Sequence, residues 1–370
     1  VVQSSLASLS IDFYGELITS GGTASLENFL DNEQKYINSG LDYVNGNISL
    51  NGADNALDLA NSKVAFIFNG DHNKVTLNGD SNDFSYNGSA NIFVSIGSSD
   101  AVTANGDFNT LSVFGSQNTV AGNGQSDTIN VSGQTNQVTA GNSTVNVADG
   151  SSATLNGISD IIAVENSVSL LINGGDMTIS ANGDANSITA NGNNENIAFD
   201  GNSNDVIANG SGDTINVAGQ NETLTAGSSS VSVGNAAQID VNGESLGITL
   251  GYDARLIVGG EYIGVVLSQD GDTVTLNGTS LGLTGSTNAT TATVNGSNDS
   301  IDVDGSRNTF IANGNENYLT SSGDNDSLTI NGSGTIATIT GEADSVSIAY
   351  GTVNVGDSSQ IEVNLSLIHI

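Results

Sequence analysis

Apolar and polar residues alternate along the chain in short runs that recur every nine residues. From Asn69 the pattern x-G-x-x-[ND]-x-U-x-x, in which U is apolar, runs unbroken through eight tandem blocks. The blocks begin at Asn69, Asn78, Asn87, Ile96, Asn105, Phe114, Asn123 and Ser132. Related blocks begin at Asn51, Asn182, Asn191, Asp200, Asn209, Ala218, Asn295, Asp304, Asn313 and Ser322, with Glu at the fifth position in those from Asn191 and Ala218. Repetition on this scale predicts a repeat architecture.

Each block has the signature of one short strand and one corner. The seventh and often the ninth positions are apolar, as in Val75 and Leu77. This is the two-residue period of a strand with one buried face. An Asn-Gly pair commonly opens the block, and we expect it to supply the positive φ angles that a tight corner needs. The repeats therefore predict strands and corners, without helices.

A strand this short needs partners, and two blocks can form one coil of a parallel β-solenoid, a β-helix or β-roll. Each coil would contain about 18 residues, and stacked strands would lie about 4.8 Å apart. Residue i then lies beside residue i+18. The prediction is thus an all-β fold, with two columns of side chains stacked inside the solenoid. One column contains Phe66, Phe84 and Val102, and the other contains Phe68, Tyr86 and Ala104.

Three related segments interrupt the regular arrays. They read STVNVADGSSATLNG, SSVSVGNAAQIDVNG and GTVNVGDSSQIEVN, and their strands are spaced by eight residues instead of nine. We interpret them as a slightly different coil that recurs within the same solenoid.

The two ends of the chain differ from the repeat domain, which we place at residues 45–364. In residues 1–44, the stretch ASLENFLDNEQKYI puts its apolar residues on one side of a helix. These residues are Leu26, Phe29, Leu30, Tyr36 and Ile37. The segment is interpreted as an N-terminal helical cap over the first coil, or as the end of a preceding domain.

Residues 365–370 spell LSLIHI, which matches the translation of a transposase adapter used in sequencing libraries. We expect adapter read-through there, and a natural apolar C-terminus is the alternative. In either case the chain is interpreted as a fragment of a longer bacterial protein from an environmental sample.

The fifth position of each block indicates how the coils are joined. Stacked Asn side chains can donate and accept along the axis, whereas stacked Asp side chains about 4.8 Å apart would repel one another. The acids Asp100 and Asp127 fall between amides, which favours a ladder without metal. The predicted asparagine ladder comprises Asn73, Asn91 and Asn109 in one column, and Asn82, Asn118 and Asn136 in the other.

Two pairs of acids break this alternation. Glu195 falls beside Asp213, and Asp326 falls beside Asp344, because the members of each pair are two blocks apart. Paired carboxylates with corner carbonyls would offer hard oxygen ligands, so these four residues are candidate Ca²⁺ ligands. A solvated acidic edge is the alternative. No other cofactor is expected.

The period and the [ND]-x-U end of each block resemble the nonapeptide repeats GGxGxDxUx of RTX proteins. That resemblance implies a bacterial secreted or surface β-roll whose Asp side chains and corner carbonyls bind calcium. The chain departs from the motif, because Asp71, Asp80, Ser89 or Asp107 replaces the last Gly. The phrase G-x-x-N-x-U-x-U also resembles curlin repeats, which build adhesive solenoids without metal, although their period is longer and their flanking Gln is absent here.

Composition excludes several partners. The chain has 370 residues with 40 acidic and five Lys or Arg side chains, a formal charge of −35, and no Cys. Phosphate surfaces need clustered Lys and Arg, so nucleic acid is not an expected partner. No apolar run approaches the roughly 18 residues of a membrane-spanning helix. The lack of Cys excludes disulfides and thiolate metal sites.

The sequence gives little support for catalysis, so we do not expect this chain to be an enzyme. Lys, Arg and His72 are scattered, and no nucleophile has a base beside it in the sequence. The segment from Leu250 to Gly264, with Arg255 and Glu261, is the best location for a carbohydrate contact, and a structural loop is the simpler interpretation. Hydroxyl rows that could bind ice or another flat surface are interrupted, for example at Val94, so we expect no persistent T-x-T rows.

These patterns favour a structural and adhesive segment of a large secreted or cell-surface bacterial protein, such as a stalk, a matrix filament or an adhesin passenger. Its partner would be an unknown surface, a glycan or another copy of the chain. A calcium-stabilised RTX-like β-roll is the first alternative, and a carbohydrate-active β-helix is the second.

Overall fold

A computed structural model describes residues 65–356 continuously, together with residue 53 and six strands outside that range. Those strands are β1 (Ser8–Ile11), β2 (Leu17–Ser20), β3 (Tyr36–Ser39), β4 (Asn47–Asn51), β5 (Ala56–Ala60) and β40 (Ile361–Leu365). The residues described contain β-strands and corners, with no helix among them. Consequently they include no helical segment suited to crossing a membrane.

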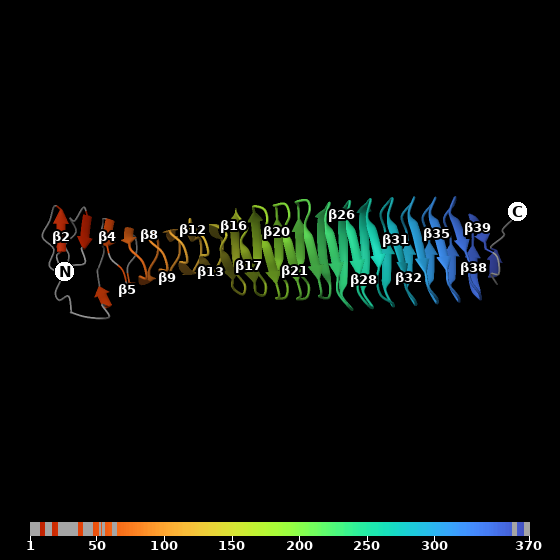
Figure 1. Cartoon of the computed structure of the whole chain (residues 1–370), viewed down its shortest axis with the longest axis horizontal. Helices are drawn as coiled ribbons and strands as arrows, with labels where there is room; N and C mark the ends of the chain where they lie inside the picture. Colours follow the sequence, from red (N-terminus) through yellow and green to blue (C-terminus); the bar gives the residue numbers. More distant parts are fainter. Residues whose placement is uncertain are drawn as a thin grey trace. The chain divides into compact units, whose positions relative to one another are not determined.

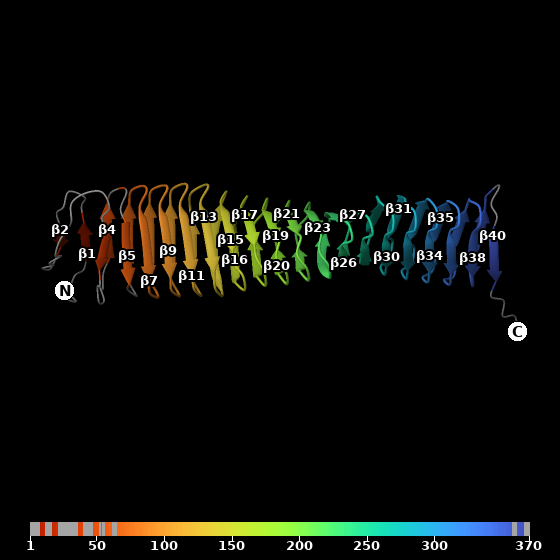
Figure 2. The ribbon, with the colours of Figure 1, turned by 90° about the horizontal axis from the view of Figure 1, so that it is seen from below.

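The described chain divides into two compact units. Residues 1–180 and 186–188 form the first, and residues 181–185 and 189–370 form the second. From β2 onward, even-numbered strands pair within one sheet and odd-numbered strands within another, and we refer to these as the even sheet and the odd sheet. Strand β1 is the exception, because it joins the even sheet and pairs antiparallel with β2 and parallel with β4. From β2 onward, successive strands alternate between the two sheets, so that two strands and their corners make one coil (Figures 1 and 2).

In the first unit, the even sheet contains β1, β2, β4, β6 (Ala65–Asn69), β8 (Asp83–Asn87), β10 (Ala101–Asn105), β12 (Thr119–Gly122), β14 (Asn136–Gly141), β16 (Ser152–Ile158) and β18 (Ser169–Asn173). The odd sheet contains β3, β5, β7 (Lys74–Asn78), β9 (Ile92–Ile96), β11 (Thr110–Phe114), β13 (Thr128–Ser132), β15 (Thr144–Val147) and β17 (Ile161–Val164). Strands β19 (Thr178–Ala181) and β20 (Ser187–Ala190) contain residues of both units.

In the second unit, the even sheet contains β22 (Asp205–Ala208), β24 (Glu222–Gly227), β26 (Gln238–Glu244), β28 (Arg255–Glu261), β30 (Thr273–Leu276), β32 (Thr291–Val294), β34 (Thr309–Ala312), β36 (Ser327–Ile330), β38 (Asp344–Ile348) and β40. The odd sheet contains β21 (Asn196–Phe199), β23 (Thr214–Val217), β25 (Ser230–Val233), β27 (Gly247–Leu250), β29 (Gly264–Leu267), β31 (Gly282–Ser286), β33 (Ser300–Asp304), β35 (Tyr318–Ser322), β37 (Ile336–Ile339) and β39 (Thr352–Val355).

The predicted register, in which residue i lies beside residue i+18, is confirmed. Phe66 pairs with Phe84, which pairs with Val102, all in parallel strands. The ring centroids of Phe66 and Phe84 are 5.0 Å apart, and those of Phe68 and Tyr86 are 5.3 Å apart. These side chains are buried between the two sheets. The fold is therefore the parallel β-solenoid that the repeats predict, with aromatic columns at its centre.

The three variant segments form shorter coils, also as predicted. Thr128 pairs with Thr144, Thr214 with Ser230, and Ile336 with Thr352, so each partner comes two positions earlier than in a regular coil. The strands remain parallel and stay in the odd sheet. Each of these coils therefore has two residues fewer than a regular coil, and its corners are shorter while the stack of strands continues.

The prediction that Asn-Gly supplies positive φ at the corners is right in part. The glycine of the pair has φ values of 140° at Gly70 and 144° at Gly106. A second positive-φ residue, the fourth of the block, was not predicted and is seldom glycine, with φ values of 59° at His72 and 61° at Phe108. The second-position glycine is also needed for space, because a Cβ on Gly88 would lie 2.2 Å from the carbonyl oxygen of Gly70 in the neighbouring coil.

The N-terminal helix is wrong for Tyr36 and Ile37, because both lie in β3, which pairs in parallel with β5. Leu26, Phe29 and Leu30 lie outside the described residues. Strand β1 pairs in parallel with β4, so sheet pairing extends to residues before position 45. At the other end, Leu365 pairs with Ile348, and residues 366–370 lie outside the described part of the chain.

Candidate functional site

The predicted columns at the fifth position exist and are buried. In each column, a residue's backbone N–H donates to the side-chain oxygen of its counterpart in the next coil. The distance is 2.8 Å from Asn73 to Asn91, 2.9 Å from Asn91 to Asn109, and 2.9 Å from Asn118 to Asn136. The exposed fraction of these side chains is at most 1%. The predicted stacking is confirmed. Its shorter bond runs from backbone to side chain, and a side-chain amide also donates along the column, as Asn91 does to Asn109 at 3.2 Å.

This geometry explains why Asp can alternate with Asn. The backbone N–H needs only an acceptor, and Oδ1 of Asp100 accepts from Asn82 at 2.8 Å. An Asn side chain also donates from Nδ2 to a corner carbonyl, as Asn109 does to Gly106 at 2.6 Å. An ionised Asp lacks that donor, and at Asp100 the Ser95 hydroxyl donates to the second oxygen at 2.5 Å.

A second asparagine ladder, which was not predicted from the sequence, lies on the surface at the first position of the block. The side-chain amide of Asn87 donates to Asn69, that of Asn105 to Asn87, and that of Asn123 to Asn105, at 2.7, 3.0 and 2.7 Å. These bonds are exposed to solvent. They should contribute less than the buried ladder, because water can replace them.

Both predicted acid pairs come together. The backbone N–H of Glu195 donates to Oδ1 of Asp213 at 2.9 Å, and that of Asp326 donates to Oδ1 of Asp344 at 2.9 Å. All four side chains are at most 2% exposed, so the alternative of a solvated acidic edge is wrong. Among the residues described, no group of three or more His, Cys, Asp or Glu side chains is placed to hold a metal. Calcium binding at these two pairs is therefore untested.

Thermal unfolding can test whether the acid pairs bind calcium. Because a backbone N–H already occupies one oxygen of Asp213, we expect calcium and magnesium to change the melting temperature equally. If the chain had a specific calcium site, calcium at a concentration 100 times the Kd of that site would instead add about 2.7 kcal/mol to the free energy of unfolding. A calcium-specific rise that disappears in Asp213→Asn would contradict this expectation and establish the site.

Burial perturbs several acids of the same columns. Desolvation raises the pKa of Asp160, Asp272 and Asp299 to about 6, against the lowering effect of a backbone N–H donated to each. Desolvation likewise raises the pKa of Glu222 to about 7. The second carboxyl oxygen of Asp272 and of Asp299 is buried without a hydrogen-bond partner. A neutral, protonated carboxyl therefore fits these positions better than a charged one.

Stability should consequently rise as the pH falls from about 7 to about 4. In this window the folded chain holds protons that the unfolded chain releases, because the pKa of an unfolded Asp is about 3.9. Denaturant unfolding at several pH values measures the slope. Asp272→Asn and Asp299→Asn should flatten this slope. Each unit by which folding raises a pKa corresponds to about 1.4 kcal/mol in the free energy of unfolding. An unchanged slope in both variants, or an equal change in the exposed control Asp302→Asn, would contradict the assignment.

The Arg255 region is regular strand and contains no extra loop. Arg255 begins β28 and pairs with Gln238, and Glu261 ends the strand. The nearby Tyr252 and Tyr262 are exposed. Arg255 lines a hollow of about 130 Å³ with Glu222 and Asp240, so its acidic neighbours come from preceding strands. The residues that line this hollow include no aromatic ring on which a sugar could stack.

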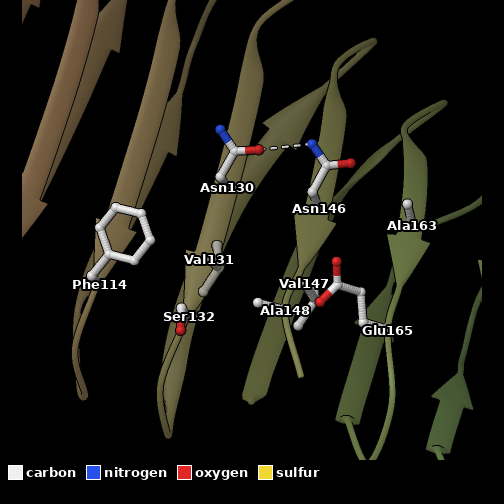
Figure 3. A pocket seen from close by; sticks show the side chains of 9 residues that line it. All are labelled: Phe114, Asn130, Val131, Ser132, Asn146, Val147, Ala148, Ala163 and Glu165. Carbon is white, nitrogen blue, oxygen red and sulfur yellow. Dashed lines mark hydrogen bonds between the residues drawn. The ribbon is translucent and has the colours of Figure 1, made fainter. Parts of the chain in front are cut away.

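A larger hollow, of about 230 Å³, lies on the odd sheet of the first unit (Figure 3). It follows from the first short coil. Strands β11 and β13 pair as far as Phe114 with Ser132, whereas β13 and β15 pair only as far as Val131 with Val147. The hollow is lined by Phe114, Asn130, Val131, Ser132, Asn146, Val147, Ala148, Ala163 and Glu165.

The lining of this hollow combines an aromatic ring with amides and a carboxylate. Phe114 occupies the first position of its block, where most blocks have Asn, and is 45% exposed. The Asn146 side chain donates to Oδ1 of Asn130 at 2.8 Å. Oε2 of Glu165 accepts the Asp149 backbone N–H at 3.1 Å. This site was not predicted from the sequence, although Phe114 in place of Asn, just before a short coil, was a usable signal.

Outward-facing threonines stack for two strands in the even sheet of the second unit. Thr273 and Thr275 pair with Thr291 and Thr293 of the next strand. In the strand after that, Thr309 continues one row, whereas Ile311 interrupts the other. The later positions are Ser327, Thr329, Ser345 and Ser347. Paired T-x-T rows therefore do not persist in this sheet, as expected.

Comparison of the chain with protein-family models, with curated proteins and with solved structures finds no match. Function must therefore be argued from the geometry above.

Proposed function

We propose that this chain is a structural and adhesive segment of a large secreted or cell-surface bacterial protein, serving as a stalk, a matrix filament or an adhesin passenger without catalytic activity. The observation that supports this proposal is the buried ladder. In each unit, the backbone N–H at one corner finds its acceptor in the next coil, as Asn91 does in Asn109. Stability then comes from contacts between neighbouring coils, which allows a protein to be extended by adding repeats.

The surface chemistry supports the same role. The formal charge of −35 keeps such a chain soluble and opposes lateral association between copies. Polar side chains occupy most outward strand positions, while a few apolar ones gather near Phe114. An adhesive segment needs this combination of a soluble frame and a local contact surface.

Surface display tests the proposal. The chain is anchored on a non-adherent bacterial cell, and retention under flow is measured on glass, cellulose and chitin films. We expect several-fold higher retention on at least one surface than for a flexible Gly/Ser linker of equal length. Equal retention on all three would contradict the adhesive role, and release of soluble sugars from the films by the purified chain would contradict the absence of catalysis.

A further inference from the structure

The hollow beside Phe114 continues into an exposed apolar strip. Ile96 pairs with Phe114 in the adjacent strand, and the two side chains are 48% and 45% exposed. Ile92 and Val94, in the same strand as Ile96, also face outward. On a surface this acidic and polar, apolar side chains clustered over adjacent strands favour a contact with a ligand.

At the polar end of the hollow, a row of side-chain hydrogen bonds across adjacent strands ends at Asn146. The Asn130 amide donates to the Ser112 hydroxyl at 3.0 Å, and the Asn146 amide donates to Asn130 at 2.8 Å. The next residue in this row is Ala163, which pairs with Asn146 and has no polar side-chain atom. In Figure 3 the side-chain oxygen of Asn146 turns toward Ala163. That oxygen is therefore placed to accept a hydrogen bond from a ligand.

A second acceptor stands across the hollow. Glu165 is exposed, and its Oε2 is held by the backbone N–H of Asp149 at 3.1 Å. This bond fixes the carboxylate while leaving Oε1 available. Figure 3 shows the carboxylate turned toward β15, with Phe114 on the opposite side. An apolar ring face and two fixed acceptors therefore border the same hollow.

We propose that this hollow binds a neutral oligosaccharide. The apolar face of a sugar ring would stack on Phe114, and its hydroxyl groups would donate to Asn146 and Glu165. Acidic sugars and a second copy of this chain are disfavoured, because Glu165 and the formal charge of −35 would repel them. The inference rests on the proposed adhesive function and names its partner.

The test is isothermal titration calorimetry of the full chain with cellohexaose, laminarihexaose, maltohexaose and chitohexaose, and with a hexamer of galacturonic acid as the acidic comparison. We expect at least one neutral hexasaccharide to bind with a Kd between about 1 μM and 1 mM. Phe114→Ala should weaken binding about tenfold or more, and Glu165→Ala should weaken it too. The matched control is Phe108→Ala, because Phe108 is 66% exposed at a corner and does not line the hollow.

Three results would overturn the inference: no binding of any neutral probe, equal binding by Phe114→Ala and Phe108→Ala, or equal affinity for the acidic hexamer. Self-association in sedimentation that Phe114→Ala abolishes would assign the strip to a second copy instead. The two proposals can fail separately. Surface retention that persists in displayed Phe114→Ala rejects the sugar site alone, whereas sugar binding without retention on any surface rejects the adhesive role.

Discussion

Replacing Gly314 by alanine will disrupt the coils around it. The added Cβ would lie 1.5 Å from the carbonyl oxygen of Gly296 and 2.5 Å from its carbonyl carbon. Both atoms belong to the backbone of the adjacent coil, so relief requires the coils to separate and their hydrogen bonds to stretch. We expect a loss above about 4 kcal/mol in the free energy of unfolding, or local unfolding of the surrounding coils. Denaturant unfolding followed by circular dichroism measures this loss.

The matched control is Gly247→Ala. Gly247 begins β27, and a Cβ there would meet no atom within 4 Å. Because alanine reduces the freedom of the unfolded chain, this substitution should be neutral or stabilise by about 0.4–1 kcal/mol. Equal destabilisation by the two substitutions would show that the close approach of corner glycines does not hold the stack together.

Asn109→Leu should produce the second large loss. It removes the oxygen that accepts the Asn91 backbone N–H at 2.9 Å and the amide that donates to Gly106 at 2.6 Å. Each buried polar group left without a partner costs about 1–3 kcal/mol, so the total should be about 2–6 kcal/mol. Denaturant unfolding measures the total, and hydrogen exchange should show a selective loss of protection at the Asn91 amide.

Two variants give this prediction its specificity. Asn109→Asp keeps the acceptor and should cost less than Asn109→Leu. Asn105→Leu removes an exposed ladder residue and should cost about 0.5 kcal/mol or less, as for other surface substitutions. An unchanged exchange rate at Asn91 in Asn109→Leu would refute the backbone-to-side-chain ladder.

Register was predictable because the repeat spacing alone sets which residues stack. Phe66 and Phe84 stack because two nine-residue blocks separate them, whatever the details of the corner. The same reasoning placed Asn73 beside Asn91, and Glu195 beside Asp213. It also identified the short coils, since a missing residue changes the spacing directly.

The atoms that meet within a column were harder to predict. A period identifies Asn73 and Asn91 as neighbours but does not distinguish an amide donor from a backbone N–H donor. The left-handed corner residue was missed because the side chains there, such as His72 and Phe108, have nothing in common. Burial of the fifth position depends on how the corner turns, which the apolar pattern does not encode.

Two further misses have different causes. Tyr36 and Ile37 fit a helical face in sequence, but parallel pairing with β5 places them in a strand. The hollow beside Phe114 depends on a short coil and an exposed ring acting together, and neither feature alone indicates a site.

Disulfide trapping tests the stacked-coil account most directly, because the chain has no natural Cys. Thr119 and Gln137 are exposed partners in adjacent strands, two blocks apart in the sequence. Their expected Cα spacing of about 4.8 Å falls within the range for a disulfide. The double variant Thr119→Cys with Gln137→Cys should oxidise readily within one chain, whereas Thr119→Cys with Thr128→Cys, in opposite sheets, should stay reduced. Oxidation of the second pair in preference to the first would contradict the account.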